Sequence, residues 1–280
     1  MMNYAIFICT HGRPDEQHTL KALRKAGYTG KIILVVDDED DTVPELMLKT
    51  YGDAEIVRFC KQHYIDTVDI GRSDAKRKAI LYAKCACEDV AKERNLDAFV
   101  IADDDITDFR FRYESDGKLL TQYVTKNMDV IIESYLTFIL DCNVCMTSFG
   151  TNQMFMGGRI SDERKGEFRI PYNFLFRNTS IPFNWISEMN EDTISVLAEH
   201  GNKYMIQLPF IKLEMKELMA GAKGGMTEFY NQMTTGTRIG TILMYSPSNV
   251  KYIATAKKIT HAIKKDNAFP KLISSSIKRK

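Results

Sequence analysis

The sequence predicts an α/β fold with a mixed, mainly parallel sheet flanked by helices, and three observations support this fold class. Apolar runs of strand length alternate with helical patterns over roughly the first hundred residues, as in successive strand–helix–strand units. Three of these runs end directly in polar, mostly acidic clusters. The chain has 280 residues, of which 44% are hydrophobic and 27% charged, which is typical of a globular protein with a sizeable core.

The first elements follow from local patterns. Tyr4–Cys9 is a continuous apolar run and predicts a buried strand. Pro14 can start a helix, which Thr19–Lys25 continues until Gly27 ends it. Lys31–Val36 predicts the second strand.

The next elements repeat the alternation. Glu45–Tyr51 predicts a helix and Ala54–Cys60 a third strand. Ser73–Asn95, which is rich in Ala, Lys and Glu, predicts a long helix. Ala98–Ala102 predicts the fourth buried strand.

The second half has a less regular pattern. Asp129–Leu140 predicts an amphipathic helix. The stretch Phe168–Trp185 is dense in aromatic residues, which fit either the core or a surface that stacks on a sugar or base. The remaining expected elements are a strand pair at Asn143–Phe149 and Gln153–Met156, a helix at Thr193–His200, a strand at Lys203–Leu208, a loop at Gly221–Gly225 and a helix at Tyr252–Ile263.

The chain lacks the sequence signals of a membrane or secreted protein. The longest apolar runs, such as Val130–Leu140, are too short to span a bilayer, and the start resembles a strand rather than a signal peptide. The six cysteines show no zinc-site spacing, since Cys142 and Cys145 have no second pair. We expect free, buried thiols and a cytoplasmic protein.

Three polar clusters are the first candidates for a binding site. Thr10–Arg13, Asp37–Asp41 and Asp103–Asp105 each follow a predicted strand, and ligands bind beyond the carboxyl ends of the strands in open α/β sheets. Asp103 and Asp105 can face the same side of an extended segment and share a Mg²⁺ or Mn²⁺ ion. The alternative is an acidic turn that only ends the strand.

Further charged residues have two readings each. Asp37 or Asp38 can accept hydrogen bonds from a nucleoside, or belong to a solvated loop. Lys76 and Arg77 lie in the first turns of the predicted Ser73–Asn95 helix, where they can face a diphosphate or solvent. Glu191 and Asp192 precede a helix and can supply a general base or only cap it.

Five segments, taken in order, resemble the GT-A family of nucleotide-sugar glycosyltransferases. They are ICTHGRPD at residues 8–15, VVDDEDD at 35–41, GRSDAKRKAI at 71–80, FVIADDD at 99–105 and NED at 190–192. The order W-x₅-EDT from Trp185, followed by KGG at 223–225 and Tyr230, is similar to the TET-associated glycosyltransferases. Members of that family, from phages and eukaryotes, are thought to glycosylate hydroxymethylated pyrimidines in DNA.

The resemblance implies a phage-encoded enzyme of the host-cell cytoplasm, with a UDP-sugar donor, a divalent metal and double-stranded DNA as acceptor. It implies that Asp103 and Asp105 hold the metal and that Asp192, beside Glu191, is the base. The donor-binding residues that it implies are Thr10, Arg13, Asp37, Asp38, Lys76, Arg77, Asp103, Asp104 and Lys223. Residues 1–250 would be the catalytic domain, with a donor-binding half up to about 105 and an acceptor half from about 106.

Three other functions remain open at this point. They are a GT-A enzyme acting on a glycan, lipid or protein, a sugar-nucleotide nucleotidyltransferase, and a non-catalytic DNA-binding module. The formal net charge of +1 hides an asymmetry, because residues 251–280 hold nine basic residues and one acidic one. These residues, expected to be a basic helix and tail, therefore carry +8 and the first 250 carry −7. They can contact a phosphate backbone or be merely solvated.

Overall fold

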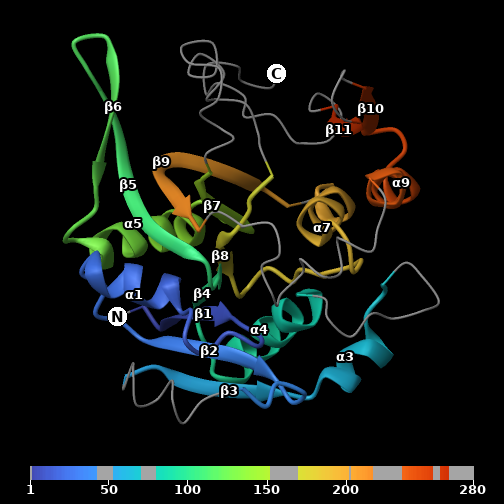
Figure 1. Cartoon of the computed structure of the whole chain (residues 1–280), viewed down its shortest axis with the longest axis horizontal. Coiled ribbons are helices and arrows are strands. Elements are labelled where there is room, and N and C mark those ends of the chain that lie inside the picture. The colour runs from blue at the N-terminus through green and yellow to red at the C-terminus, as the bar shows by residue number, and fades with distance from the viewer. Residues whose placement is uncertain are drawn as a thin grey trace, which may run out of the picture.

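A computed structural model of the chain describes residues 2–42, 53–70, 80–151, 170–201, 203–216, 235–254 and 259–264. A nine-stranded sheet runs through its centre in the order β3-β2-β1-β4-β8-β7-β9-β5-β6 (Figure 1). The strands are β1 (Tyr4–Cys9), β2 (Ile32–Asp37), β3 (Glu55–Phe59), β4 (Ala98–Asp103), β5 (Ile106–Ser115), β6 (Lys118–Tyr123), β7 (Met146–Gly150), β8 (Phe174–Asn178) and β9 (Met205–Met215). The helices are α1 (His18–Lys25), α3 (Lys61–Thr67), α4 (Leu81–Glu93), α5 (Met128–Asp141), α7 (Glu191–Glu199) and α9 (Thr235–Tyr245).

The sheet is mixed and parallel through its first half. β1 pairs in parallel with β2 and β4, and β2 pairs in parallel with β3. β8 then runs antiparallel between β4 and β7, and β9 runs parallel to β7. The predicted fold class is therefore confirmed, and the carboxyl ends of β1, β2 and β4 lie at one edge.

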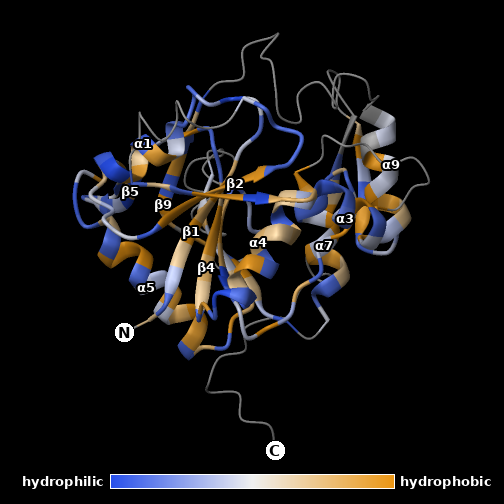
Figure 2. Cartoon of the chain, turned by 90° about the horizontal axis from the view of Figure 1, so that it is seen from below, coloured by the Kyte–Doolittle hydropathy of each residue, from blue (hydrophilic) through white to orange (hydrophobic). Residues whose placement is uncertain are grey.

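Helices cover both faces of the sheet. Figure 2 shows α1 and α5 on one side of the apolar strands β1 and β4, with α4 and α7 on the other. Period-two alternation explains this arrangement, since Phe7 of β1 packs with the α4 side while Ile6 and Ile8 pack with α1 and α5. None of the described helices has the length and apolarity needed to cross a membrane.

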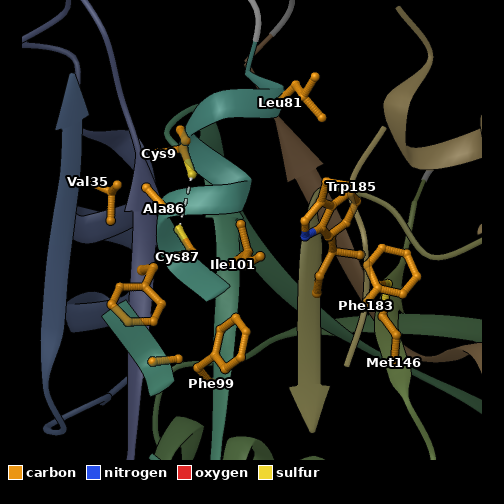
Figure 3. Close-up of a cluster of buried hydrophobic side chains, with 14 of the residues drawn as sticks. Cys9, Val35, Leu81, Ala86, Cys87, Phe99, Ile101, Met146, Phe183 and Trp185 are labelled. Atoms are coloured by element: carbon orange, nitrogen blue, oxygen red, sulfur yellow. Dashed lines mark hydrogen bonds between the residues drawn. The ribbon is translucent and has the colours of Figure 1, made fainter. Parts of the chain in front are cut away.

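The core on the α4 side is dense in aromatic and sulfur-containing side chains (Figure 3). Cys9 and Cys87 meet there with their sulfurs 3.8 Å apart. All six cysteines are free, as predicted, but only Cys9, Cys87 and Cys145 are buried, while Cys60 and Cys142 are exposed.

Several predicted elements are confirmed with altered bounds. The first helix starts at His18 rather than Pro14, and Gly27 follows it with a φ of 85°, a conformation that favours glycine. The described part of the predicted Ser73–Asn95 helix is α4. The expected elements at Glu45–Tyr51, Gln153–Met156 and Gly221–Gly225 lie outside the described residues.

The helix predicted at Tyr252–Ile263 is wrong in its described part. The chain instead forms the antiparallel strands β10 (Val250–Ala254) and β11 (Ile259–Ile263), which pair Val250 with Ile263. Val, Ile, Tyr and Thr dominate both segments, and β-branched and aromatic residues favour strands. Val250 is buried, whereas residues 251–254 are all exposed, so no amphipathic helical face marks this segment.

Candidate active site

Hydrogen bonds join the three polar clusters at the carboxyl edge of the sheet. The Thr10 hydroxyl donates to Asp104 Oδ2 at 2.8 Å, and Arg13 Nη1 lies 3.0 Å from Asp104 Oδ1. The Gly12 amide donates to Asp40 Oδ2 at 2.7 Å. The loops after β1, β2 and β4 therefore meet, as their positions in the sequence predict.

Asp104, the middle residue of the acidic run, binds the protein itself. It is 6% exposed, and its two carboxylate oxygens are held by Thr10 and Arg13. Burial raises the pKa of Asp104, while Arg13 and Thr10 act in the opposite direction. Asp104 thus fixes the β1 loop against the end of β4, and this interaction also sets the places of Thr10 and Arg13.

Asp103 and Asp105 have different surroundings. Asp103 Oδ2 accepts a hydrogen bond from Asn173 Nδ2 at 2.7 Å, whereas Asp105 Oδ1 is buried without a hydrogen-bond partner. Burial and the charge of Asp105 raise the pKa of Asp103 to about 7, and burial and Asp104 raise that of Asp105 to about 6. Neighbouring carboxylates that repel each other in this way can share a cation.

The residues present fit a hard divalent cation. Such an ion commonly takes one or two protein carboxylates and completes its shell with phosphate and water oxygens. The buried oxygen of Asp105 that lacks a partner is the observation that favours this fit. Across the described part of the chain, no three His, Cys, Asp or Glu side chains form a complete metal site, so the pair would supply only part of the shell.

The two candidate nucleoside-binding acids after β2, Asp37 and Asp38, differ in exposure: Asp37 is buried and Asp38 is exposed. Asp37 is 5% exposed and pairs with His11 Nδ1 at 2.7 Å and Lys61 Nζ at 2.8 Å. Burial opposes its ionisation, but these two partners lower the pKa of Asp37 to about 2. Asp38 is exposed, and its Oδ1 accepts the Lys61 amide at 3.0 Å. Asp38 is therefore the more accessible carboxylate of the two.

Glu191 and Asp192 lie in the first turn of α7, and both contact the ammonium group of Lys84, a partner that the sequence did not reveal. Lys84 Nζ, on α4, lies 2.8 Å from Glu191 Oε1 and also contacts Asp192 Oδ1. Burial raises the pKa of Asp192 to about 7 against the effect of Lys84, with smaller contributions from Glu191 and Asp103. Asp103, at the end of β4, acts electrostatically on both Asp192 and Lys84.

The aromatic stretch belongs mainly to the core. Phe174, Phe176, Phe183 and Trp185 are each at most 5% exposed, so the core reading is confirmed for them. Phe168 lies outside the described residues. The same holds for Lys76, Arg77 and Lys223, whose predicted roles stay predictions.

Comparison with known proteins decides the family. The sequence profile of the TET-associated glycosyltransferases matches residues 4–218. The chain belongs to this family. It is therefore a glycosyltransferase, which sets aside the nucleotidyltransferase and the non-catalytic DNA-binding module.

Solved structures agree on the fold. Mannosyl-3-phosphoglycerate synthase from Rubrobacter xylanophilus is similar with a TM-score of 0.50 and 12% identity, over 94% of this chain and 87% of that one. This likeness confirms the GT-A type of fold. Glucosyl-3-phosphoglycerate synthase from Mycobacterium tuberculosis, crystallised with Mn²⁺, UDP and phosphoglyceric acid, is similar with a TM-score of 0.48 and 12% identity, over 94% and 86% of the two chains. A search of curated proteins by sequence finds no match.

Proposed function

We propose that this glycosyltransferase moves a sugar from a UDP-sugar to a hydroxymethyl group on a pyrimidine base in double-stranded DNA. The observation that carries the reaction is the pairing of two sites: the Asp103–Asp105 carboxylates at the end of β4 and Asp192, near them, at the start of α7. The acceptor is argued from the family and from the charge of the carboxyl-terminal segment.

The donor diphosphate would bind at the end of β4. Asp103 and Asp105 would hold a Mn²⁺ or Mg²⁺ ion, as the partnerless oxygen of Asp105 favours. When bound, the cation neutralises negative charge on the departing nucleotide. The synthase from Mycobacterium tuberculosis that was crystallised with Mn²⁺ and UDP has both ligands that this arrangement requires.

The nucleoside would lie along the loops after β1 and β2. Asp38 is exposed there and would accept a hydrogen bond from the base or ribose. Thr10, Arg13 and Asp37 complete this proposed binding surface, with Asp104 holding Thr10 and Arg13 in place. We further propose that Lys76, Arg77 and Lys223 approach the diphosphate, on the strength of the sequence alone.

Asp192 would take the proton of the acceptor hydroxyl. As the oxygen of the hydroxymethyl group bonds to the anomeric carbon of the sugar, the bond from that carbon to the UDP oxygen breaks, and the proton passes to the Asp192 carboxylate. Its pKa of about 7 suits this work, because a general base is most effective when its pKa lies near the operating pH.

The carboxyl-terminal segment favours a polyanionic acceptor. Residues 229–280 contain ten Lys or Arg residues and one acidic residue, Asp266. Their described part forms α9, β10 and β11, and α9 packs beside α7, the helix that carries Asp192 (Figure 1). An uncharged glycan acceptor gives no reason for this excess of positive charge.

A UDP-release assay tests the function. Several UDP-sugars are each combined with unmodified, hydroxymethylcytosine-containing and hydroxymethyluracil-containing duplexes, and the asparagine variant of the base, Asp192→Asn, serves as control. We expect release that depends on both one sugar and one hydroxymethylated duplex, and its loss in Asp192→Asn with donor binding retained. Release that no duplex stimulates would contradict the DNA acceptor.

A further inference from the structure

The ammonium group of Lys84 occupies an unusual place. The side chain is 3% exposed and lies in the first turn of α4, and a lysine side chain is rarely buried without a partner. It meets two carboxylates, Glu191 and Asp192, and the ring centroid of Trp185 lies 4.9 Å from its nitrogen. Burial opposes the charge, but the two carboxylates outweigh it and raise the pKa of Lys84 well above its usual value.

A chain of buried contacts that starts at β8 positions the ammonium group of Lys84. The Trp185 indole N–H donates to Glu88 Oε1 at 3.2 Å, and Glu88 lies one turn after Lys84 on α4. Arg177 of β8, which is fully buried, binds Glu88 through Nε at 2.7 Å and Nη2 at 3.2 Å. Figure 3 shows Trp185 beside α4 within this core. Because each partner is fixed by the next, the position of Lys84 is set by the sheet.

The three side chains of this ion-pair cluster, Lys84, Glu191 and Asp192, differ in how far they are exposed. The side chain of Asp192 is 22% exposed, against 8% for Glu191 and 3% for Lys84. Lys84 contacts Asp192 through Oδ1, and Asp192 remains the most accessible of the three side chains. If Lys84 served only to neutralise buried acids, Asp192 would not need to be accessible. Its exposure therefore favours a role in the reaction.

We infer that Lys84 is a positioning residue for the transfer: it holds the Asp192 carboxylate ionised and directed toward the acceptor. This inference rests on the proposed role of Asp192 as the base. Among the described residues, the charged groups that act on Asp192 are Lys84 from α4, Glu191 from its own helix and Asp103 from β4. Lys84 alone favours the ionised carboxylate, so its removal leaves two acids that disfavour it.

The test compares Lys84→Met, which keeps the stem and loses the charge, with Lys84→Arg, which keeps the charge. Lys92→Met is the matched control, because Lys92 lies on the same helix with a side chain that is 55% exposed. The measurements are kcat and KM for donor and acceptor from pH 5.5 to 9. Trp185 is the single tryptophan of the chain, so its fluorescence reports directly on whether the site is intact.

For Lys84→Met we expect kcat at pH 7 to fall ~30- to 100-fold, with donor KM within about twofold, because loss of an effective general base costs ~10²–10⁴ in rate. The acidic limb of the pH profile should move to higher pH, since the pKa of Asp192 rises without Lys84. Lys84→Arg should recover most of the rate and the original profile, and Lys92→Met should match the wild type.

Full-rate transfer by Lys84→Met with an unshifted pH profile would overturn the inference. If the Trp185 emission shows that Lys84→Met does not fold, Lys84→Gln against Lys84→Arg decides, because only the glutamine variant should shift the profile. A failure of the proposed function is distinguishable: no duplex would then stimulate UDP release by the wild type, and Asp192→Asn would release UDP at the wild-type rate.

Discussion

At the scale of single residues, the three aspartates at the end of β4, Asp103–Asp105, have different surroundings. The side chain of Asp104 is fully used by Thr10 and Arg13, whereas Asp105 keeps a buried oxygen without a partner. Three adjacent residues of one type therefore differ in what they can bind. The middle residue stabilises the loop after β1, whereas Asp103 and Asp105 are the residues for which we propose a metal ion.

Two substitutions separate these roles. Asp105→Asn should lower sugar transfer at least ~100-fold and leave the melting temperature unchanged or slightly raised, because it removes repulsion between carboxylates. Asp104→Asn should instead cost about 1–3 kcal/mol of stability, since it weakens the interactions with Arg13 and Thr10. UDP release measured against Mn²⁺ concentration, together with thermal unfolding, checks both. Full activity of Asp105→Asn would remove its assignment to the metal.

A second residue-scale prediction concerns the His11–Asp37 pair and pH. Asp37 raises the pKa of His11 above 6.5, so the stability that this histidine contributes is complete below pH 6.5 and is lost as the pH rises through the folded-state pKa. The pKa of Asp37 is lowered from 3.8 to about 2, so its contribution is present above pH 3.8 and is lost as the pH falls toward 2. The pair therefore stabilises most between these limits.

Replacing His11 by glutamine tests this dependence. The wild type should lose about 0.5 kcal/mol between pH 6 and 8, a small amount because the His11 side chain is 37% exposed and solvent screens the pair. That loss corresponds to ~1–2 °C in melting temperature. His11→Gln should lack this part of the decline. Identical slopes for the two proteins across pH 6 to 8 would show that the pair contributes nothing.

At the scale of elements, the strands with the plainest sequence pattern were the most predictable. β1, β2 and β4 are buried on both faces, so they read as continuous apolar runs with an abrupt polar end. The hairpin of β5 and β6 was missed because it forms no apolar run: charged and polar residues interrupt β5, and its aromatic residues Phe111 and Tyr113 are exposed. β5 owes its place to pairing with β9, about a hundred residues later, which no local pattern reveals.

The site shows the same limit. The convergence of Thr10, Asp37 and Asp103 was predictable, because parallel strands that end in polar clusters bring those clusters to one edge. Lys84 was not predictable. It stands in an Ala- and Lys-rich stretch typical of a solvated helix, and the partners that identify it lie 107 and 108 residues later.

The ion pair between α4 and β8 carries a prediction at this scale. Arg177→Met should cost about 3–5 kcal/mol, because it leaves the buried Glu88 carboxylate without its cation. Arg94→Met is the control. It also removes an ion pair at the end of α4, but Arg94 and Glu55 are 29% and 39% exposed, so the expected cost is at most about 1 kcal/mol. Chemical denaturation measures both, and equal costs would contradict the structural role of the buried pair.

At the scale of the whole molecule, the distribution of charge matters more than its sum. The family profile ends at residue 218, and basic residues outnumber acidic ones only after that point, by eleven to two. Lys251 and Lys264 are exposed on the β10–β11 unit, beside α9. A surface that neutralises phosphates releases counterions, so binding through it weakens steeply as salt increases.

Acceptor KM measured against salt concentration therefore tests whether this unit binds the duplex. The double substitution Lys251→Gln and Lys264→Gln should raise acceptor KM severalfold at low salt and reduce the slope of log KM against log salt by ~1 for each phosphate that is no longer neutralised. Donor KM should not change, because the proposed donor site lies at the end of β4. Lys118→Gln removes another exposed lysine, from β6 on the far side of the molecule, and should leave the slope unchanged (Figure 1). An acceptor KM that ignores salt, or a slope that responds equally to Lys118→Gln, would assign the excess charge to solubility rather than to DNA.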